Sequence, residues 1–559
     1  MFHIRPLPLS VELFAQESAT SLASRLARRN GAPRLITFCS DIGINYFALC
    51  NGDVDEVCRL AAFASVDENP LLKHTPCVIR KDWFQLGEAE IKFSAFQRTK
   101  PRICPICNAD NFVGDHKISA HQNGSAQLIA MRVCPLHLCV LQELPKAQSN
   151  KDHFDIAQLA TGYDSQETTR VQKSELKLID YILSRLNGTT ASGWYNQLPF
   201  HVATQTAENF GLLLLKGPIV KRQSISGLEW LQAGSVGYSF LQQGPDAMIE
   251  KLGELERNRP MDNSLYRARF GVFFEWLRNR DDDVAFDAIR DPVRDFIFDT
   301  YPISKGAQVL GVENPRRKFH THRTLTKERR LDFTKTGHAL IQRGYARKNE
   351  HNSFELLRYV PAEVADKVAH ELNRVFTKTR TAKKLGVTRA TLDQLIAHKL
   401  ILPHFKHRGA VPGFHSDEIW QFATSVTKGW VPYFGNAPAK RWVSFQDAAK
   451  LCRCATWQVI AMVIHYKLPV TNPDRNKKLL SDHITCPITL ADKFTEIENG
   501  VVSLLMAGRL LGCERTEIER LIVDGSLKET PIFARQAKKK HRSVEREDVE
   551  ALMMGTEHL

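Results

Sequence analysis

Apolar residues recur at helical spacing along most of this chain, and that spacing predicts a mainly α-helical protein. In the segment 17–31, Leu22 and Leu26 stand four residues apart with alanines beside them, and Asn30-Gly31 ends the pattern. The middle of the chain shows similar apolar spacing, which predicts further helices. These helices are expected at 176–186, 247–255 and 267–277.

From about residue 300 onward, one pattern repeats. A small residue is followed by a glycine turn and a second amphipathic stretch, as in Ala382, Gly386 and Thr388 of the second copy. The alanine lets two helices approach, the glycine accepts a positive φ, and the threonine caps the second helix. Equivalent positions are Ala448 and Thr456 in the third copy and Ala507 and Gly512 in the fourth. The repeat therefore predicts helix-turn-helix modules.

The first copy is broken by an insertion. Residues 305–312 are interpreted as its opening helix, residues 340–345 as its close, and the basic residues between them as the insertion. Each copy ends in a strand that leads into a capped helix, at 359–365, 414–422, 479–484 and 543–552. Basic stretches at 406–409 and 538–542 precede two of these tails. The arrangement resembles the winged helix-turn-helix of the excisionase and MerR type.

In such a module the second helix enters the major groove, where Arg and Gln bond guanine and adenine edges. The basic stretch before the tail contacts phosphates, and the basic insertion follows the backbone or a minor groove. The candidate DNA-contacting residues are Arg316, Arg317, Lys318, Arg323, Arg329, Arg330, Thr388, Arg389, Asp393, Gln394, Lys406, His407, Arg408, Thr456, Gln458, Arg515, Thr516, Arg520, Lys538, Lys539, Lys540 and Arg542.

The third copy has an alternative interpretation. Its second helix carries few charges, and Trp457, Val459, Ile460, Met462 and Val463 make it largely apolar. Such a helix favours packing against a neighbour or a partner over reading DNA.

Two pairs of potential metal ligands stand between residues 104 and 137. Cys104-Pro105-Ile106-Cys107 and Cys134-Pro135-Leu136-His137 are separated by 26 residues, and each pair has the spacing of a zinc knuckle. Four protein ligands leave no open position, so the predicted Zn²⁺ is structural. Chance spacing and disulfides are the alternatives. The other cysteines, Cys139 among them, show no second ligand spacing and are expected to be small buried apolar residues.

The N-terminus lacks the apolar core of a secretion signal, which predicts a cytoplasmic, reducing environment and favours metal over disulfides. No apolar run is long enough to span a membrane. The formal charge of +14 suggests a polyanionic partner, most often nucleic acid. No nucleophile–base set or phosphate-binding glycine loop stands out, and Asp281-Asp282-Asp283 is expected to be a solvated turn.

The length of 559 residues predicts about three to five domains. The expected fold is mainly α and multi-domain: a zinc-stapled N-terminal domain, a helical middle region and a C-terminal tandem array of winged helix-turn-helix modules. A polar stretch at 145–152 is a candidate linker. The expected boundaries are 1–160, 161–300, 301–375 for the degenerate first copy, 376–430, 440–495 for a helix-turn-helix, and 500–559.

The N-terminal motifs together resemble the TniQ family. They are Glu17-Ser18-x-x-Ser21-Leu22-x-x-Arg25-Leu26-Ala27-x-x-Asn30-Gly31, Arg102-x-Cys104-Pro105-x-Cys107 and Val133-Cys134-Pro135-x-His137-x-x-x-Leu141. The C-terminal array is similar in architecture to the longer TnsD-type branch. One departure is that no Trp stands at 108–133, between the two ligand pairs.

The resemblance implies a bacterial, nucleoid-associated protein that selects target sites for a transposon. It would bind attachment-site double-stranded DNA through residues 300–559 and recruit the AAA+ ATPase regulator of the transposase through residues 1–160. The transposase complex would be an indirect partner, and the protein itself would not be an enzyme.

Two other functions stay open. One is an adaptor that links an RNA-guided effector complex to the transposition machinery, or another DNA-binding recombination accessory factor. The second is a nuclease or recombinase, because the acidic residues of such enzymes are scattered in sequence.

Overall fold

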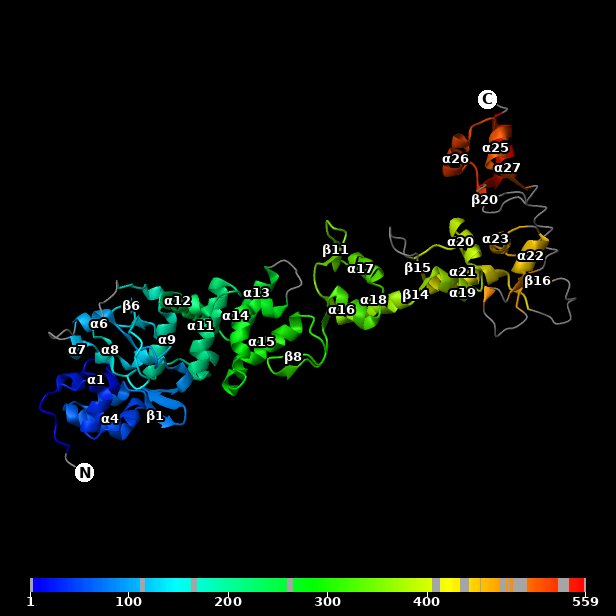
Figure 1. The fold of residues 1–559 in the computed structure, drawn as a ribbon. Coiled ribbons are helices and arrows are strands. Elements are labelled where there is room, and N and C mark those ends of the chain that lie inside the picture. The colour runs from blue at the N-terminus through cyan, green and yellow to red at the C-terminus, as the bar shows by residue number, and fades with distance from the viewer. Residues whose placement is uncertain are drawn as a thin grey trace. The chain divides into compact units, whose positions relative to one another are not determined.

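A computed structural model describes most of the chain as two compact units, Met1–Phe319 and His320–Leu559 (Figure 1). Within the described ranges, no helix combines the length and the apolar character needed to cross a lipid bilayer. The described residues are 4–110, 116–161, 168–258, 265–404, 413–432, 442–452, 454–472, 479–480, 483–485, 500–530 and 542–556.

The first unit opens with five short helices around one core. They are α1 (Ala19–Arg29), α2 (Leu35–Asp41), α3 (Tyr46–Cys50), α4 (Val54–Ala64) and α5 (Glu68–Lys73). The predicted helix at 17–31 is confirmed as α1, with Leu22 and Leu26 fully buried and Asn30 at its C-cap. The helix is buried almost all round, because residues from α2, α4 and the chain near Ile118 and Phe154 pack against the same cluster.

Short strands follow these helices. The antiparallel sheet β1 (Cys77–Arg80), β2 (Trp83–Leu86) and β3 (Ala89–Lys92) precedes η1 (Phe93–Ala95) and two small ladders. In the ladders, β4 (Arg102–Ile103) pairs with β7 (Gln142–Glu143), and β5 (Val133–Cys134) pairs with β6 (Cys139–Val140). The helices between and after them are α6 (Pro105–Asp110), α7 (His116–Ser119), η2 (Gly124–Gln127) and α8 (Ile156–Leu159).

The predicted linker at 145–152 packs against the first helices, so that interpretation is wrong. Tyr46 donates its hydroxyl hydrogen to the Lys151 carbonyl, and Arg34 forms an ion pair with Asp152 at 2.7 Å. Just beyond, Asp155 is 1% exposed and accepts bonds from Ser24 and Arg28. Polar side chains there satisfy partners on α1 and α2, which composition alone does not reveal.

The rest of the first unit is helical, as the apolar spacing predicts (Figure 1). The elements are η3 (Lys173–Glu175), α9 (Lys177–Leu186), α10 (Trp194–Gln197), α11 (Phe200–Lys216), η4 (Arg222–Ser224), α12 (Gly227–Leu241), α13 (Pro245–Arg257), α14 (Tyr266–Arg278), η5 (Val284–Phe286), α15 (Asp287–Thr300), β8 (Gln308–Val309) and β9 (Val312–Glu313). Helix α11 lies at the centre and contacts β3, α12 and α14. The segments 1–160 and 161–300 therefore lie in one compact unit.

Asp283 is bound within the fold, so the solvated-turn interpretation is wrong for this residue. Its carboxylate lies 2.7 Å from Lys92 Nζ and 3.0 Å from His201 Nε2, and its side chain is 14% exposed. It joins β3 and α11 to the turn before η5. Burial lowers the pKa of His201 despite the nearby carboxylate.

The second unit repeats one topology: a strand, two helices and then one to three strands, followed in the first, second and fourth copies by a final helix. The repeat follows the copies that the sequence predicts, with one change at the first copy. Copy 1 has β10 (Phe319–His320), α16 (His322–Arg329), α17 (Phe333–Gln342), β11 (Ala346–Lys348), β12 (Phe354–Leu356), β13 (Val360–Pro361) and α18 (Ala362–Asn373). Copy 2 has β14 (Val375–Thr377), α19 (Lys378–Leu385), α20 (Arg389–Ala397), β15 (Gly413–His415), α21 (Ser416–Val426) and η6 (Thr427–Gly429). Copy 3 has β16 (Val443–Ser444), α22 (Phe445–Leu451), α23 (Thr456–Tyr466), β17 (Val470–Thr471) and β18 (Ile484–Thr485). Copy 4 has β19 (Val501–Ser503), α25 (Leu504–Leu511), α26 (Arg515–Val523), β20 (Glu529–Thr530), β21 (Ser543–Glu545) and α27 (Arg546–Thr556).

The interpretation of the first copy is wrong in its opening helix. Residues 305–312 belong to the β8–β9 hairpin of the first unit, and α16 is the first helix of copy 1. The basic residues predicted to form an insertion therefore lie in the segment that precedes α16 and along α16 itself. Gly311, at φ +83°, makes a hairpin turn here, whereas the same Leu-Gly pair ends a helix in copies 2 and 4. A short motif does not distinguish the two, because both need only a residue tolerant of positive φ.

The turn chemistry of the other copies is confirmed at three positions. Gly386 and Gly512 lie in the left-handed region, at φ +71° and +68°, and Thr388 caps α20 by accepting a bond from the Thr391 amide. The prediction that Thr456 caps α23 is wrong. Ala455 occupies that position, and its amide donates to Gln458 Oε1 at 2.8 Å.

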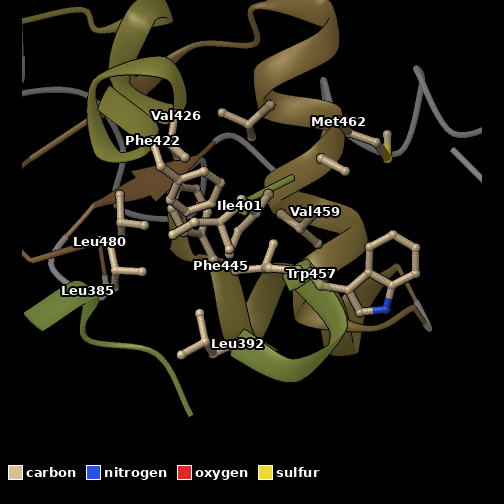
Figure 2. Close-up of a cluster of buried hydrophobic side chains, with 14 of the residues drawn as sticks. Leu385, Leu392, Ile401, Phe422, Val426, Phe445, Trp457, Val459, Met462 and Leu480 are labelled. Atoms are coloured by element: carbon tan, nitrogen blue, oxygen red, sulfur yellow. The ribbon is translucent and has the colours of Figure 1, made fainter. Parts of the chain in front are cut away.

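Copies 2 and 3 share one hydrophobic core (Figure 2). Leu385, Leu392 and Phe422 of copy 2 lie in the same buried cluster as Phe445 and Val459 of copy 3. At the edge of the cluster, the rings of His398 and Trp457 stack with centroids 3.8 Å apart and planes 8° apart. The prediction that the third copy packs against a neighbour is confirmed, because α23 buries its apolar residues against α20 and α21.

Candidate metal centre and nucleic-acid interface

Three short elements bring four potential metal ligands together. Cys104 lies between β4 and α6, Cys107 lies on the first turn of α6, Cys134 ends β5, and His137 lies in the β5–β6 turn. Their ligand atoms all lie within 4.8 Å of one another. Pro105 starts α6, a position where its missing N–H costs nothing, and the Cys107 amide donates to Cys104 Sγ at 3.3 Å. The local structure of each pair is therefore a knuckle that points two side chains at one point.

The distances match a tetrahedral ion. With Zn–S near 2.3 Å and Zn–N near 2.0–2.1 Å, tetrahedral edges are about 3.8 Å between sulfurs and about 3.5 Å between sulfur and nitrogen. Cys107 Sγ lies 3.7 Å from Cys134 Sγ. His137 Nδ1 lies 3.5, 3.2 and 3.6 Å from the sulfurs of Cys104, Cys107 and Cys134. The Cys₃His cluster could hold a metal ion, and its geometry is consistent with zinc.

The ionisation of the thiols in the cluster is also consistent with a bound cation. Hydrogen bonding to Cys104 and Cys134 raises the pKa of the Cys107 thiol, and burial raises it further. Three crowded sulfurs cannot all become thiolates unless a positive charge offsets their repulsion. Opposite the cluster, Asp110 Oδ2 lies 3.2 Å from His137 Nε2. A carboxylate in that position fixes the imidazole so that Nδ1 faces the metal.

Two residues at this centre were missed by the sequence interpretation. Asp110 follows Cys107 by three residues, so one turn of α6 would have indicated its place. Cys139 is fully buried, and its Sγ lies 3.5 Å from Cys104 Sγ. No spacing rule predicted this contact, because it depends on the pairing of Cys134 with Cys139 across the hairpin.

The N-terminal motif residues have a structural role. Glu17 and Arg25 form an ion pair at 2.6 Å with side chains 0% and 2% exposed, and the Arg25 guanidinium lies over the Phe14 ring. Ser21 donates to Glu17, and Ser24 donates to Asp155. The motif therefore encodes a buried polar network along α1.

The candidate DNA contacts of copy 1 divide into two groups. Arg317 donates to the Pro302 carbonyl and Lys318 pairs with Asp299, so these two side chains make contacts within the first unit. Arg316 is exposed before β10. On copy 1 itself, Arg323 and Arg330 are exposed on and just after α16, and Arg329 pairs with Asp366 of α18.

In copies 2 and 3 the candidates on second helices have different surroundings. Thr388 and Arg389 are exposed at the start of α20, whereas Gln394 is half-buried and Asp393 pairs with Lys378 at 2.8 Å. Thr456 and Gln458 are half-buried at the start of α23, and Gln458 caps that helix. Lys406, His407 and Arg408 lie outside the described residues.

The arginines of copy 4 are paired with carboxylates. Arg515 lies 3.2 Å from Glu519, Arg520 lies 3.5 Å from Glu517, and Arg542 lies 2.6 Å from Glu529. Thr516 is exposed at the start of α26. Lys538, Lys539 and Lys540 lie outside the described residues. The α26 face is thus less positive than its arginines alone suggest.

Helix α19 carries a basic face that the sequence interpretation missed. Arg380, Lys383 and Lys384 are exposed, while Thr381, Ala382 and Leu385 face the core. Arg380 and Lys384 both lie over the Phe376 ring, at 4.8 and 4.9 Å from its centroid. In the described part of the chain, no carboxylate pairs with these three cations. Helical periodicity indicates this face, because Arg380, Lys383 and Lys384 recur at positions i, i+3 and i+4.

The first unit is thus a mainly helical domain that carries a Cys₃His cluster able to hold a metal ion, and the second is a series of helix-turn-helix modules. A family model described as TniQ matches residues 8–141, and this match supports placing the N-terminal segment in the TniQ family. Among curated proteins, none matches this chain. The TniQ domain indicates a transposition-associated role, in DNA binding or as an adaptor.

Proposed function

We propose that this protein is a TnsD-type target-site selector, which binds attachment-site DNA and recruits the transposition machinery. The basic face of α19 carries this proposal. In helix-turn-helix proteins the first helix crosses the phosphate backbone while the second presents its N-terminal residues to base edges. Arg380, Lys383 and Lys384 occupy the first helix of copy 2, and Arg389 is exposed at the N-terminal end of the second.

The charge distribution supports one DNA path over copies 1 and 2. Arg323 and Lys327 are exposed on the first helix of copy 1, the position that α19 occupies in copy 2. Copy 3 shares its hydrophobic core with copy 2 and would stabilise copy 2 through it. Several weakly binding modules on one chain gain affinity through effective concentration. Winged helix-turn-helix modules are the form of DNA-binding domain that we assign to these copies.

The metal in the first unit is, in this proposal, a structural Zn²⁺. Cys104, Cys107, Cys134 and His137 would hold it, and Asp110 would orient His137. The stapled domain would dock the AAA+ ATPase regulator, and the transposase would be reached through that ATPase. The protein supplies recognition and no catalytic residues of its own.

The test is the binding of the full chain to a genomic DNA library at several salt concentrations. We expect enrichment of one site and a log–log salt slope that falls by about 0.9 for each phosphate contact removed. Lys383→Gln with Lys384→Gln should therefore lower the slope by about 1.8 and weaken binding to all sequences alike. Arg389→Ala should relax specificity, at a cost of about 1–3 kcal/mol for one lost base contact.

A matched control removes two charges from the first unit. Lys81 and Lys146 are exposed there, and Lys81→Gln with Lys146→Gln should leave the salt slope unchanged. Equal binding to every sequence by the unaltered chain would refute a target selector. Co-purification with a guide-RNA complex, without intrinsic specificity, would favour the adaptor. Magnesium-dependent DNA cleavage would instead identify an enzyme.

A further inference from the structure

A fifth sulfur lies against the metal-binding cluster. Cys139 Sγ is 3.5 Å from Cys104 Sγ, and both side chains are buried. Cys139 is the first residue of β6, opposite the ligand Cys134 in the ladder. Leu138 takes φ +52°, which turns the chain sharply between His137 and Cys139. The hairpin therefore presents both a ligand and a second thiol to the same side of Cys104.

Cys139 lies outside the ligand set. His137 Nδ1 lies within 3.6 Å of the sulfurs of Cys104, Cys107 and Cys134, and it would complete the four-fold coordination of a bound ion. The sulfur contact of Cys139 is with Cys104, a ligand that also accepts the Cys107 amide. Cys104 is therefore the ligand that has a thiol neighbour not needed for coordination.

We propose that Cys104 and Cys139 form a peroxide-sensitive modification site, in which their disulfide replaces the bond between Cys104 and the metal. The Cys104 thiolate would attack hydrogen peroxide, breaking the O–O bond, to give a sulfenic acid and hydroxide. The Cys139 sulfur would then attack the sulfenic sulfur. An S–S bond forms, and the sulfenic oxygen leaves as water with the thiol proton. Two thiols are oxidised by two electrons, and one peroxide is reduced.

The geometry selects this pair over the other close sulfurs. Cys107 and Cys134 are 3.7 Å apart, but both would be ligands of a bound metal, so neither sulfur would be free to form a disulfide. Closing 3.5 Å to the disulfide bond length of about 2.0 Å needs a shift of about 1.5 Å. A disulfide sulfur carries no negative charge to bind the ion. The metal site would then keep only three ligands, so the ion would be released.

The experiment uses the full chain loaded with Zn²⁺ and treated with hydrogen peroxide. Metal release is followed with a chromogenic chelator, and the disulfide is located by peptide mass mapping. We expect release together with a Cys104–Cys139 linkage, and full metal rebinding after reductant and fresh Zn²⁺. With Cys139→Ser, Cys104 should end as sulfinic or sulfonic acid, and the reductant should not restore metal binding.

Cys58→Ser is the control, because Cys58 lies half-buried on α4 outside the cluster, and this variant should behave like the unaltered chain. A linkage between other cysteines, or reversible metal loss by Cys139→Ser, overturns the proposal. So does failure of both Cys139→Ser and Cys139→Ala to hold metal before oxidation, which would make Cys139 a ligand. If a variant does not fold, mass mapping of the unaltered chain decides alone. None of these outcomes depends on DNA binding.

Discussion

Arg25→Met tests whether the N-terminal motif encodes a buried ion pair. The substitution keeps the aliphatic stem and removes the guanidinium. That group bonds Glu17 Oε2 at 2.6 Å, the Ile118 carbonyl at 2.5 Å and the Glu12 carbonyl at 3.0 Å. Glu17 would then be a buried carboxylate that accepts only the Ser21 hydroxyl and the Phe14 amide. Because breaking a buried pair leaves one charge uncompensated, we expect a loss of about 3–5 kcal/mol.

The second arm replaces both charges. Glu17→Gln with Arg25→Met should recover much of that loss, because neither side chain then carries an unpaired charge. The matched control is Arg34→Met. Arg34 pairs with Asp152 at 2.7 Å in the same domain, but its side chain is 49% exposed, so the expected cost is below about 1 kcal/mol.

The assay is amide hydrogen exchange of α1 in the full chain, because unfolding of a multi-domain protein does not report on one element. A loss of about 3–5 kcal/mol corresponds to about 10²-fold to 4 × 10³-fold faster exchange in α1 if that helix opens with its domain. Helix α18 of the second unit should be unchanged. Equal acceleration by Arg25→Met and Arg34→Met would refute the argument that burial sets the cost.

Three further predictions follow from other contacts. Gly237→Ala should destabilise the first unit by about 1–3 kcal/mol or more, since its Cβ would lie 2.0 Å from the Ala207 carbonyl oxygen. Gly227→Ala, whose Cβ would have its nearest contact at 3.7 Å, should be neutral, and hydrogen exchange of α11 and α12 measures both variants. Asp110→Asn should weaken zinc binding about 10–100-fold in a competition titration, and unchanged affinity would show that the carboxylate does not orient His137. Burial lowers the pKa of His322 below its ordinary 6.5, so the neutral imidazole stabilises copy 1. This stabilisation should be present above about pH 6.5 and lost as the pH falls through the lowered pKa, with faster exchange in α16 and α17. His322→Gln should flatten this pH dependence of exchange.

The four candidate metal ligands and the helices could be predicted because both depend on short-range spacing. Two x-x pairs specify a knuckle wherever the chain folds around an ion, and α1, α9 and α13 follow from apolar residues on one helical face. The repeat was also readable, since the glycine turns at Gly386 and Gly512 are local backbone requirements. The same local pattern led to a wrong prediction for the first copy, where Leu310-Gly311 forms a hairpin turn and does not end a helix.

Tertiary structure alone decided the contacts between distant segments. Cys139 reaches Cys104 only through strand pairing, and Asp283 meets Lys92 and His201 across 191 and 82 residues of sequence. The shared core of copies 2 and 3 buries the apolar residues of α23, a burial that depends on copy 2. Which cations stay unpaired also depends on packing: Arg515 and Arg542 form ion pairs with glutamates, whereas Lys383 and Lys384 have no carboxylate partner among the residues that the structure describes. Residue type and spacing thus determined the chemistry available to this protein. The long-range packing decided which of those groups remain exposed, because burial and ion pairing depend on neighbours from elsewhere in the chain.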